Sequence, residues 1–208
     1  MKRVVVGILG TLAPLLVLLG AFAWYSDWCV RAERAERLRG YPGDELIPNP
    51  IGSVTHAVTI GRPADRVWPW LAQMGSGRAG WYAYDFIDNG GLPSADRILP
   101  ELQNVSVGTI FPWLPGAKDG FVLAQCQPQR SLVLAWRLPD GSYRVTWAFV
   151  LEQPEPTRTR LIVHGRVAPG YAPLGLPEWF GKLTAPWAHA IMERKQMLGI
   201  KRRAEAAP

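Results

Sequence analysis

The chain is poor in the residue types that usually build metal, disulfide and nucleophilic centres. Its 208 residues include two cysteines and three histidines, and 19% of them are charged. Cys29 and Cys126 are too few for a disulfide framework, so we interpret them as unpaired thiols. His56, His164 and His189 stand far apart, in neither the HxxxH nor the HxxE spacing. Because zinc needs three or four converging ligands, we expect no metal and no other cofactor.

Motifs of several common enzyme and binding classes are also missing. The sequence has no G-x-S-x-G elbow and no phosphate-binding P-loop, and Gly75-Ser-Gly77 follows a predicted helix, unlike a dinucleotide-binding turn. It has no recognition helix, zinc knuckle or RNA-binding aromatic motif, and its net charge of +6 is spread along the chain. We therefore expect no nucleic-acid partner. The apolar content of 48% argues against disorder.

One long hydrophobic run is present, from Val4 to Trp24. At 1.5 Å per residue it spans about 30 Å, the thickness of a bilayer core. Trp24, Tyr25 and Trp28 stand where an interfacial aromatic belt would lie. We predict a single-pass transmembrane anchor at residues 1–25, with its orientation left open. The alternative is a signal peptide cleaved at Ala21-Phe22-Ala23, which would make the protein secreted.

Residues 26–52 are expected to connect this segment to one domain at residues 53–205. The alternating charges of Arg31–Arg39 predict a short helix that Gly40 ends. Tyr41–Pro50 contains three prolines and a glycine, which is typical of a semi-rigid extended linker.

The rest of the chain predicts a strand, a helix, a run of antiparallel strands and a long terminal helix. Ser53–Ile60 alternates like a strand, and Pro63 opens a helix whose apolar residues recur at i, i+4 and i+7 from Val67. Strands joined by hairpins form an antiparallel sheet with one face to bury, and the terminal helix can cover that face, so the fold class is α+β. The further strands are expected at Phe121–Cys126, Ser131–Leu138, Tyr143–Glu152 and Thr157–Val167, and the terminal helix at Thr184–Ala204, with Thr184 capping its first turn.

The two faces of these strands differ in chemistry. Trp136 and Trp147 belong to faces crowded with aromatic and leucine side chains. On the last strand, Arg160, His164 and Arg166 share the opposite face. We interpret this basic row as a solvent-facing edge.

Seven segments carry a family resemblance. They are Val67-Trp-Pro-Trp-Leu-Ala-Gln-Met-Gly75, Arg78-Ala-Gly-Trp-Tyr-Ala-Tyr-Asp85, Pro42–Glu45, Ser94–Arg97, Pro100–Gln103, Met192–Lys195 and Gly199–Glu205. Together they resemble the bacterial SRPBCC (START-like, helix-grip) superfamily of polyketide cyclases and lipid-transport proteins, over roughly residues 41–205. At Gly108-Thr109 the related sequences usually carry Gly-Asp, so a role for that acid is absent here.

The resemblance implies a helix-grip fold, with a seven-stranded antiparallel sheet curved around the long C-terminal helix. It also implies an apolar cavity between sheet and helix, of the kind used for lipids, sterols or polyketides. We therefore expect a binding or carrier domain for an apolar small molecule or lipid, tethered to a bacterial cell membrane and without catalysis. The alternatives are a cyclase-type enzyme that uses the same cavity, and a structural or regulatory module whose side chains fill it.

Candidate site residues follow from this hypothesis. Tyr84 and Asp85 are the catalytic candidates, as proton-transfer groups. Asp85 has a structural alternative, in which it caps a turn or pairs with Arg78. Asp88 and Asn89 follow, but further oxygen ligands at calcium-loop spacing do not. The candidate ligand-binding residues are Trp70, Trp81, Tyr84, Phe111, Trp136, Trp147 and Phe149.

Overall fold

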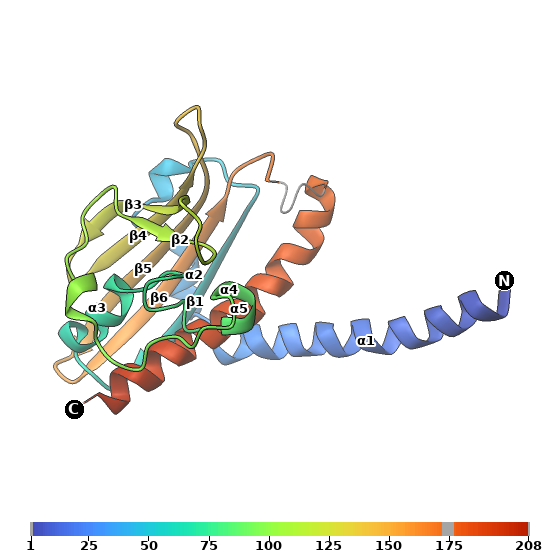
Figure 1. Ribbon diagram of the computed structural model, residues 1–208, viewed down its shortest axis with the longest axis horizontal. Coiled ribbons are helices and arrows are strands. Elements are labelled where there is room, and N and C mark those ends of the chain that lie inside the picture. The colour runs from blue at the N-terminus through green and yellow to red at the C-terminus, as the bar shows by residue number, and fades with distance from the viewer. Residues whose placement is uncertain (1, 172–176, 208) are drawn as a thin grey trace.

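The computed structural model describes residues 2–171 and 177–207 and has an α+β architecture (Figure 1). A long N-terminal helix leads through short helical segments into an antiparallel sheet, and a second long helix closes the chain. The helices are α1 (Lys2–Cys29), α2 (Arg34–Leu38), η1 (Asp44–Leu46), α3 (Ala64–Ala72), α4 (Asp85–Asp88), η2 (Pro100–Leu102) and α5 (Glu178–Ala206). The strands are β1 (Gly52–Ile60), β2 (Ile110–Pro112), β3 (Gly120–Gln127), β4 (Ser131–Arg137), β5 (Tyr143–Glu155) and β6 (Arg158–Val167).

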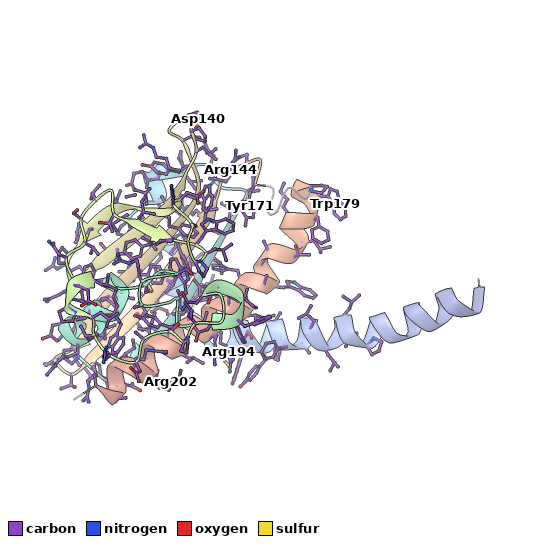
Figure 2. The ribbon with its side chains drawn as sticks, in the orientation of Figure 1. Asp140, Arg144, Tyr171, Trp179, Arg194 and Arg202 are labelled. Carbon is purple, nitrogen blue, oxygen red and sulfur yellow. The ribbon has the colours of Figure 1, made fainter. Side chains whose placement is uncertain are left out.

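The sheet is fully antiparallel, in the order β1-β6-β5-β4-β3-β2. The strand that closes the run, β6, lies inside the sheet, because Val163 is opposite His56 of β1 and Phe149 of β5. Asp140 marks the tip of the β4–β5 hairpin (Figure 2), at the predicted turn. Five predicted strands are confirmed and β2 was missed. The sheet has six strands in the part of the chain described, one fewer than the resemblance implied.

The main core lies between one face of the sheet and the helices α3 and α5. Leu134 and Phe149 of the sheet are fully buried, as are Leu71 of α3 and Met197 and Ile200 of α5. Each such side chain contributes about 1.5–3 kcal/mol by leaving water. This arrangement of an antiparallel sheet on a long C-terminal helix fits the expected helix-grip architecture.

The opposite face of the sheet is covered by the segment between α1 and β1. Arg160 pairs with Glu36 of α2 at 2.8 Å, and Arg166 pairs with Asp44 of η1 at 2.7 Å. His164 is buried beside them. The interpretation of this basic row as a solvent-facing edge is therefore wrong. Its charges hold the short charged helix, through Glu36, and the predicted linker, through Asp44, against the sheet.

The terminal helix begins earlier than predicted, at Glu178. Thr184 lies inside it and donates a side-chain hydrogen bond to the carbonyl of Phe180 at 2.8 Å, so it is not the cap. Cys29 and Cys126 are free thiols, as the sequence indicated.

The N-terminal helix projects away from the sheet and meets α5 near its own C-terminal end (Figure 1). Gly20 lies against the ring of Trp187, and the guanidinium of Arg194 lies over the ring of Tyr25 at 5.0 Å. Among the residues that the structure describes, no helix combines the length and the apolar character needed to cross a membrane.

Candidate ligand-binding cavity

A cavity of about 170 Å³ lies between the sheet and α5. Its walls are mostly aromatic: the rings of Trp81 and Trp147 stack with centroids 5.6 Å apart, and Phe121 meets Trp81 edge-on at 6.1 Å. Trp113 is 38% exposed and stands at the rim. The lining residues are Trp81, Ala83, Asp88, Trp113, Phe121, Trp147, His189, Met192, Glu193 and Gln196.

The volume limits what can enter. A cavity of about 150 Å³ in another protein holds benzene, whereas sites for drug-sized ligands run from about 300 to 1,000 Å³. A space of about 170 Å³ therefore takes a ring-sized group or the end of a chain, and it does not enclose a whole sterol.

The structure brings together some of the predicted aromatic residues and separates others. Trp81 and Trp147 line the cavity. Trp70, Phe111 and Phe149 are almost completely buried in the main core and do not line it. Trp136 lies outside the lining, with its ring packed edge-on against Phe121 and Trp113.

The two catalytic candidates do not line the cavity. Asp85 accepts hydrogen bonds from the backbone N–H of Ser94 at 3.0 Å and from its hydroxyl at 2.5 Å. Tyr84 lies with its ring under the ammonium of Lys195 at 5.8 Å. Arg78 donates to backbone carbonyls and does not pair with Asp85. The structural interpretation of Asp85, that it ties a turn, is therefore the one that the geometry supports.

A buried charge centre forms the floor of the cavity. The side chain of Glu193 is fully buried, and its Oε1 accepts a hydrogen bond of 2.9 Å from the indole N–H of Trp147. Its Oε2 contacts Nδ1 of His56 and lies 3.2 Å from Nε2 of His189. The second ring nitrogen of His56 lies 3.0 Å from a carboxylate oxygen of Asp27, at the end of α1. Charged side chains from α1, β1 and α5 thus converge behind the aromatic wall.

These contacts keep the centre ionised. Burial raises the pKa of Glu193, but the charges and hydrogen bonds of His189 and His56 outweigh burial and hold that pKa well below its usual range. Burial lowers the pKa of His56, but Glu193 and Asp27 outweigh burial and raise it above the ordinary 6.5. A buried ion pair of this kind needs a partner for each charge, because an unpaired buried charge is costly.

Three lining residues, His189, Asp88 and Gln196, carry buried polar atoms without a hydrogen-bond partner. Oδ1 of Asp88 and Oε1 of Gln196 are buried and accept no hydrogen bond. The amide of Gln196 donates instead to the sulfur of Met74 at 3.9 Å. Burial, with the charge of Asp85 as the next cause, raises the pKa of Asp88 from 3.8 to about 6. A buried acceptor left unpaired costs about 1–3 kcal/mol, so each of these atoms favours an incoming donor.

Sequence reasoning missed this polar floor. One signal was present, because His189 and Glu193 are four residues apart and so share one face of a helix. His56 and Asp27 gave no signal, since only the fold brings them to α5. Across residues 2–171 and 177–207, no group of three or more His, Cys, Asp or Glu side chains is arranged to hold a metal ion.

This chain resembles known proteins only in part. No family model matches the chain. It is 28% identical over 156 residues to the type IV secretion system protein PtlH of Bordetella pertussis, a match that covers 73% of this chain and 41% of PtlH. PtlH homologues of Bordetella parapertussis and Bordetella bronchiseptica match equally well. The chain thus spans about two fifths of the length of the curated relatives it matches.

Solved structures show only distant likeness. The hypothetical protein jhp0584 of Helicobacter pylori has a TM-score of 0.48 at 16% identity, covering 82% of this chain and 98% of that one. Protein MLL2253 of Mesorhizobium loti has a TM-score of 0.43 at 15% identity, covering 76% and 99%. The di-domain ARO/CYC protein BexL has a TM-score of 0.37 at 15% identity, covering 74% and 47%.

Proposed function

We propose that the protein binds a ring-sized apolar molecule, or the apolar end of a longer one, between the sheet and α5. The observation that carries this proposal is the cavity of about 170 Å³ between Trp81, Trp147 and Met192. Large aromatic side chains normally fill a core of this size, because interiors are close-packed. Here they leave a space with apolar walls, which is the usual character of a small-molecule site.

The expected affinity follows from the area that a ligand can bury. A ring that buries about 150 Å² at ~25 cal/mol/Å² gains about 4 kcal/mol, which corresponds to a dissociation constant near 1 mM. Apolar contact alone therefore supports weak binding, and a physiological ligand needs polar contacts as well.

Binding is favoured over catalysis by the state of the two catalytic candidates. Asp85 accepts two hydrogen bonds from Ser94, and the ring of Tyr84 faces the ammonium of Lys195. Catalysis by proton transfer needs a group that reaches the substrate, and these two do not line the cavity.

The helix α1 suggests where binding takes place, and we propose that it associates with a membrane surface. Large apolar side chains are exposed along the part of α1 whose side chains are described, and basic residues follow it, which favours an anionic surface. The exposed side chains are Leu16, Val17, Leu18, Leu19, Phe22, Trp24, Tyr25 and Trp28.

Vesicle binding tests this location. The full-length chain should sediment with vesicles of phosphatidylcholine and phosphatidylglycerol. Replacing Leu16, Val17 and Phe22 by serine should release it, while Leu38→Ser, an exposed apolar residue of α2, should not. Equal sedimentation of both variants would refute the membrane proposal and leave the cavity proposal intact.

Titration with toluene tests the cavity. NMR signals of the indole N–H groups of Trp81, Trp113 and Trp147 should shift at millimolar toluene. Ala83→Leu places a larger side chain in the lining and should abolish the shifts without unfolding the protein. Toluene shifts that are identical in the two proteins, or absent from both, would refute the proposal.

A further inference from the structure

The polar atoms of the cavity narrow the chemistry of its ligand. Asp88 and Gln196 line the cavity and each has a buried oxygen without a hydrogen-bond donor. Of the remaining polar lining groups, Glu193 already accepts a hydrogen bond from Trp147 and contacts His56, whereas Nε2 of His189 lies 3.2 Å from Glu193 and has no hydrogen-bond partner. Two buried oxygens of the site therefore lack donors, and a ligand that carries donors would satisfy atoms that the protein itself leaves unpaired.

The charges of the lining also have a definite sign. Two carboxylates, Asp88 and Glu193, stand against one imidazole, His189, so the lining is net negative whether or not that imidazole is protonated. Behind Glu193, the positive charge of His56 is offset by Asp27. The site therefore repels anions and favours a cation.

The two positively charged residues that follow Glu193 in the sequence contact aromatic rings outside the cavity. Arg194 lies over the ring of Tyr25, where α5 meets α1 (Figure 2). Lys195 lies over the ring of Tyr84. Neither lines the cavity, so neither neutralises its negative charge.

The aromatic side chains that line the cavity also favour a cation. Trp81, Trp147 and Phe121 have ring centroids within 5.6–6.1 Å of one another, and Trp113 stands at the rim. Aromatic faces attract a cation through their quadrupole, most strongly when water is excluded. Rings of this kind beside a carboxylate are suited to an ammonium group.

We propose that the ligand is a protonated amine carried on a ring-sized apolar group, with the ammonium placed between Asp88, Gln196 and the indole rings. This inference rests on the proposed function, because it assigns a chemical class to the ligand of the same cavity. Binding requires a small rotation of the Asp88 side chain toward the ligand, since its Oδ1 is buried.

Four compounds of matched size test this assignment on the full-length protein: benzylamine, benzyl alcohol, toluene and benzoate. At pH 7.5 benzylamine should bind about tenfold or more tighter than toluene, with benzyl alcohol between them and benzoate weakest. The readout is the shift of the indole NMR signals on titration.

Two variants assign the preference to specific atoms. Asp88→Asn should reduce the advantage of benzylamine over toluene to less than about threefold. Gln196→Met, which removes the unpaired oxygen, should reduce it less. Asp65→Asn is the charge-matched control, because Asp65 is exposed on α3 and does not line the cavity.

The outcomes separate the two proposals. Binding of toluene with no preference for benzylamine, or an unchanged preference in Asp88→Asn, overturns the amine assignment alone. Failure of all four compounds overturns the binding function together with it.

Discussion

The indole N–H of Trp147 donates a hydrogen bond of 2.9 Å to Oε1 of Glu193, and this bond joins the wall of the cavity to the buried charge centre. The same tryptophan stacks on Trp81, and the same carboxylate contacts His56. A change on either side of this bond should therefore alter both stability and the shape of the cavity.

Trp147→Phe tests the bond itself. Phenylalanine keeps an aromatic wall but leaves the buried Oε1 of Glu193 without its donor, so the free energy of unfolding should fall by about 1–3 kcal/mol. Urea denaturation measures it. The matched control is Trp179→Phe, because Trp179 is 67% exposed on α5 and its loss should cost less than about 0.5 kcal/mol. Equal effects of the two substitutions would contradict the role given to Trp147.

Glu193→Gln tests the charge centre. The variant leaves the positive charge of His56 without its buried partner, so we expect a loss of about 3–5 kcal/mol in the free energy of unfolding. Glu155→Gln serves as the control, since Glu155 forms an exposed pair with Arg158 at 3.5 Å. Such a surface pair is worth about 0–1 kcal/mol. A similarly small loss for Glu193→Gln would mean that the buried centre contributes little to stability.

The pH dependence of stability tests the ionisation of His56. Its pKa is raised above 6.5 because Glu193 and Asp27 outweigh burial, so folding favours the protonated ring. This stabilisation is complete below pH 6.5 and is lost as pH rises through the folded-state pKa. The stability difference between the native protein and His56→Gln should therefore shrink from about pH 6 to about pH 9.

The comparison with His56→Gln is necessary because a second histidine, His164, changes the stability with pH in the opposite direction. Burial lowers the pKa of His164, so its contribution to stability is lost as pH falls below 6.5. Subtracting the curve of His56→Gln removes this contribution from both proteins. A difference that stays constant or grows with pH would show that His56 is neutral in the folded protein. Asp27, Glu193 and His189 are the ionisable groups that face or adjoin the ring.

Asp88 should carry a measurable cost at neutral pH. Its pKa is raised from 3.8 to about 6 by burial and by the charge of Asp85, so folding disfavours the ionised form. Because the pKa of Asp88 rises on folding, Asp88→Asn should be more stable than the native protein above about pH 6, with no advantage below about pH 4. Because Asp88 is half-exposed, solvent screening reduces the expected gain to about 1 kcal/mol.

Chemical denaturation at pH 4 and pH 8 measures this difference, with Asp65→Asn as the control. Glu193 and His189 are the other titratable groups that line the cavity with Asp88. A variant that is less stable than the native protein at pH 8 would show that the carboxylate is satisfied in the folded state.

Local pattern was enough to predict most of the sheet. Alternation located β1, β3, β4, β5 and β6, and the Pro139–Ser142 turn located the hairpin between β4 and β5. Strand β2 was missed because it covers only Ile110–Pro112 and contains a proline. The cover over the outer face of the sheet was missed for a different reason, since the Glu36–Arg160 pair joins residues 124 positions apart.

The candidate site was predictable only in part. Aromatic residues on a buried face are expected near a cavity, and Trp81 and Trp147 do line it. The same pattern does not distinguish residues that line a cavity from residues that fill the core. It therefore also selects Trp70 and Phe111, which are both buried in the core. The polar floor depends on tertiary contacts between distant elements, which no local pattern reports.

A crystal of the full-length protein soaked with bromobenzene shows whether the cavity takes up an aromatic ring. Bromobenzene is ring-sized, and bromine gives an anomalous signal that fixes its position. We predict a bromine peak enclosed by Trp81, Trp147 and Met192, with the wall side chains in place. A soaked crystal in which these three side chains fill the space themselves, with no bromine among them, would contradict this prediction.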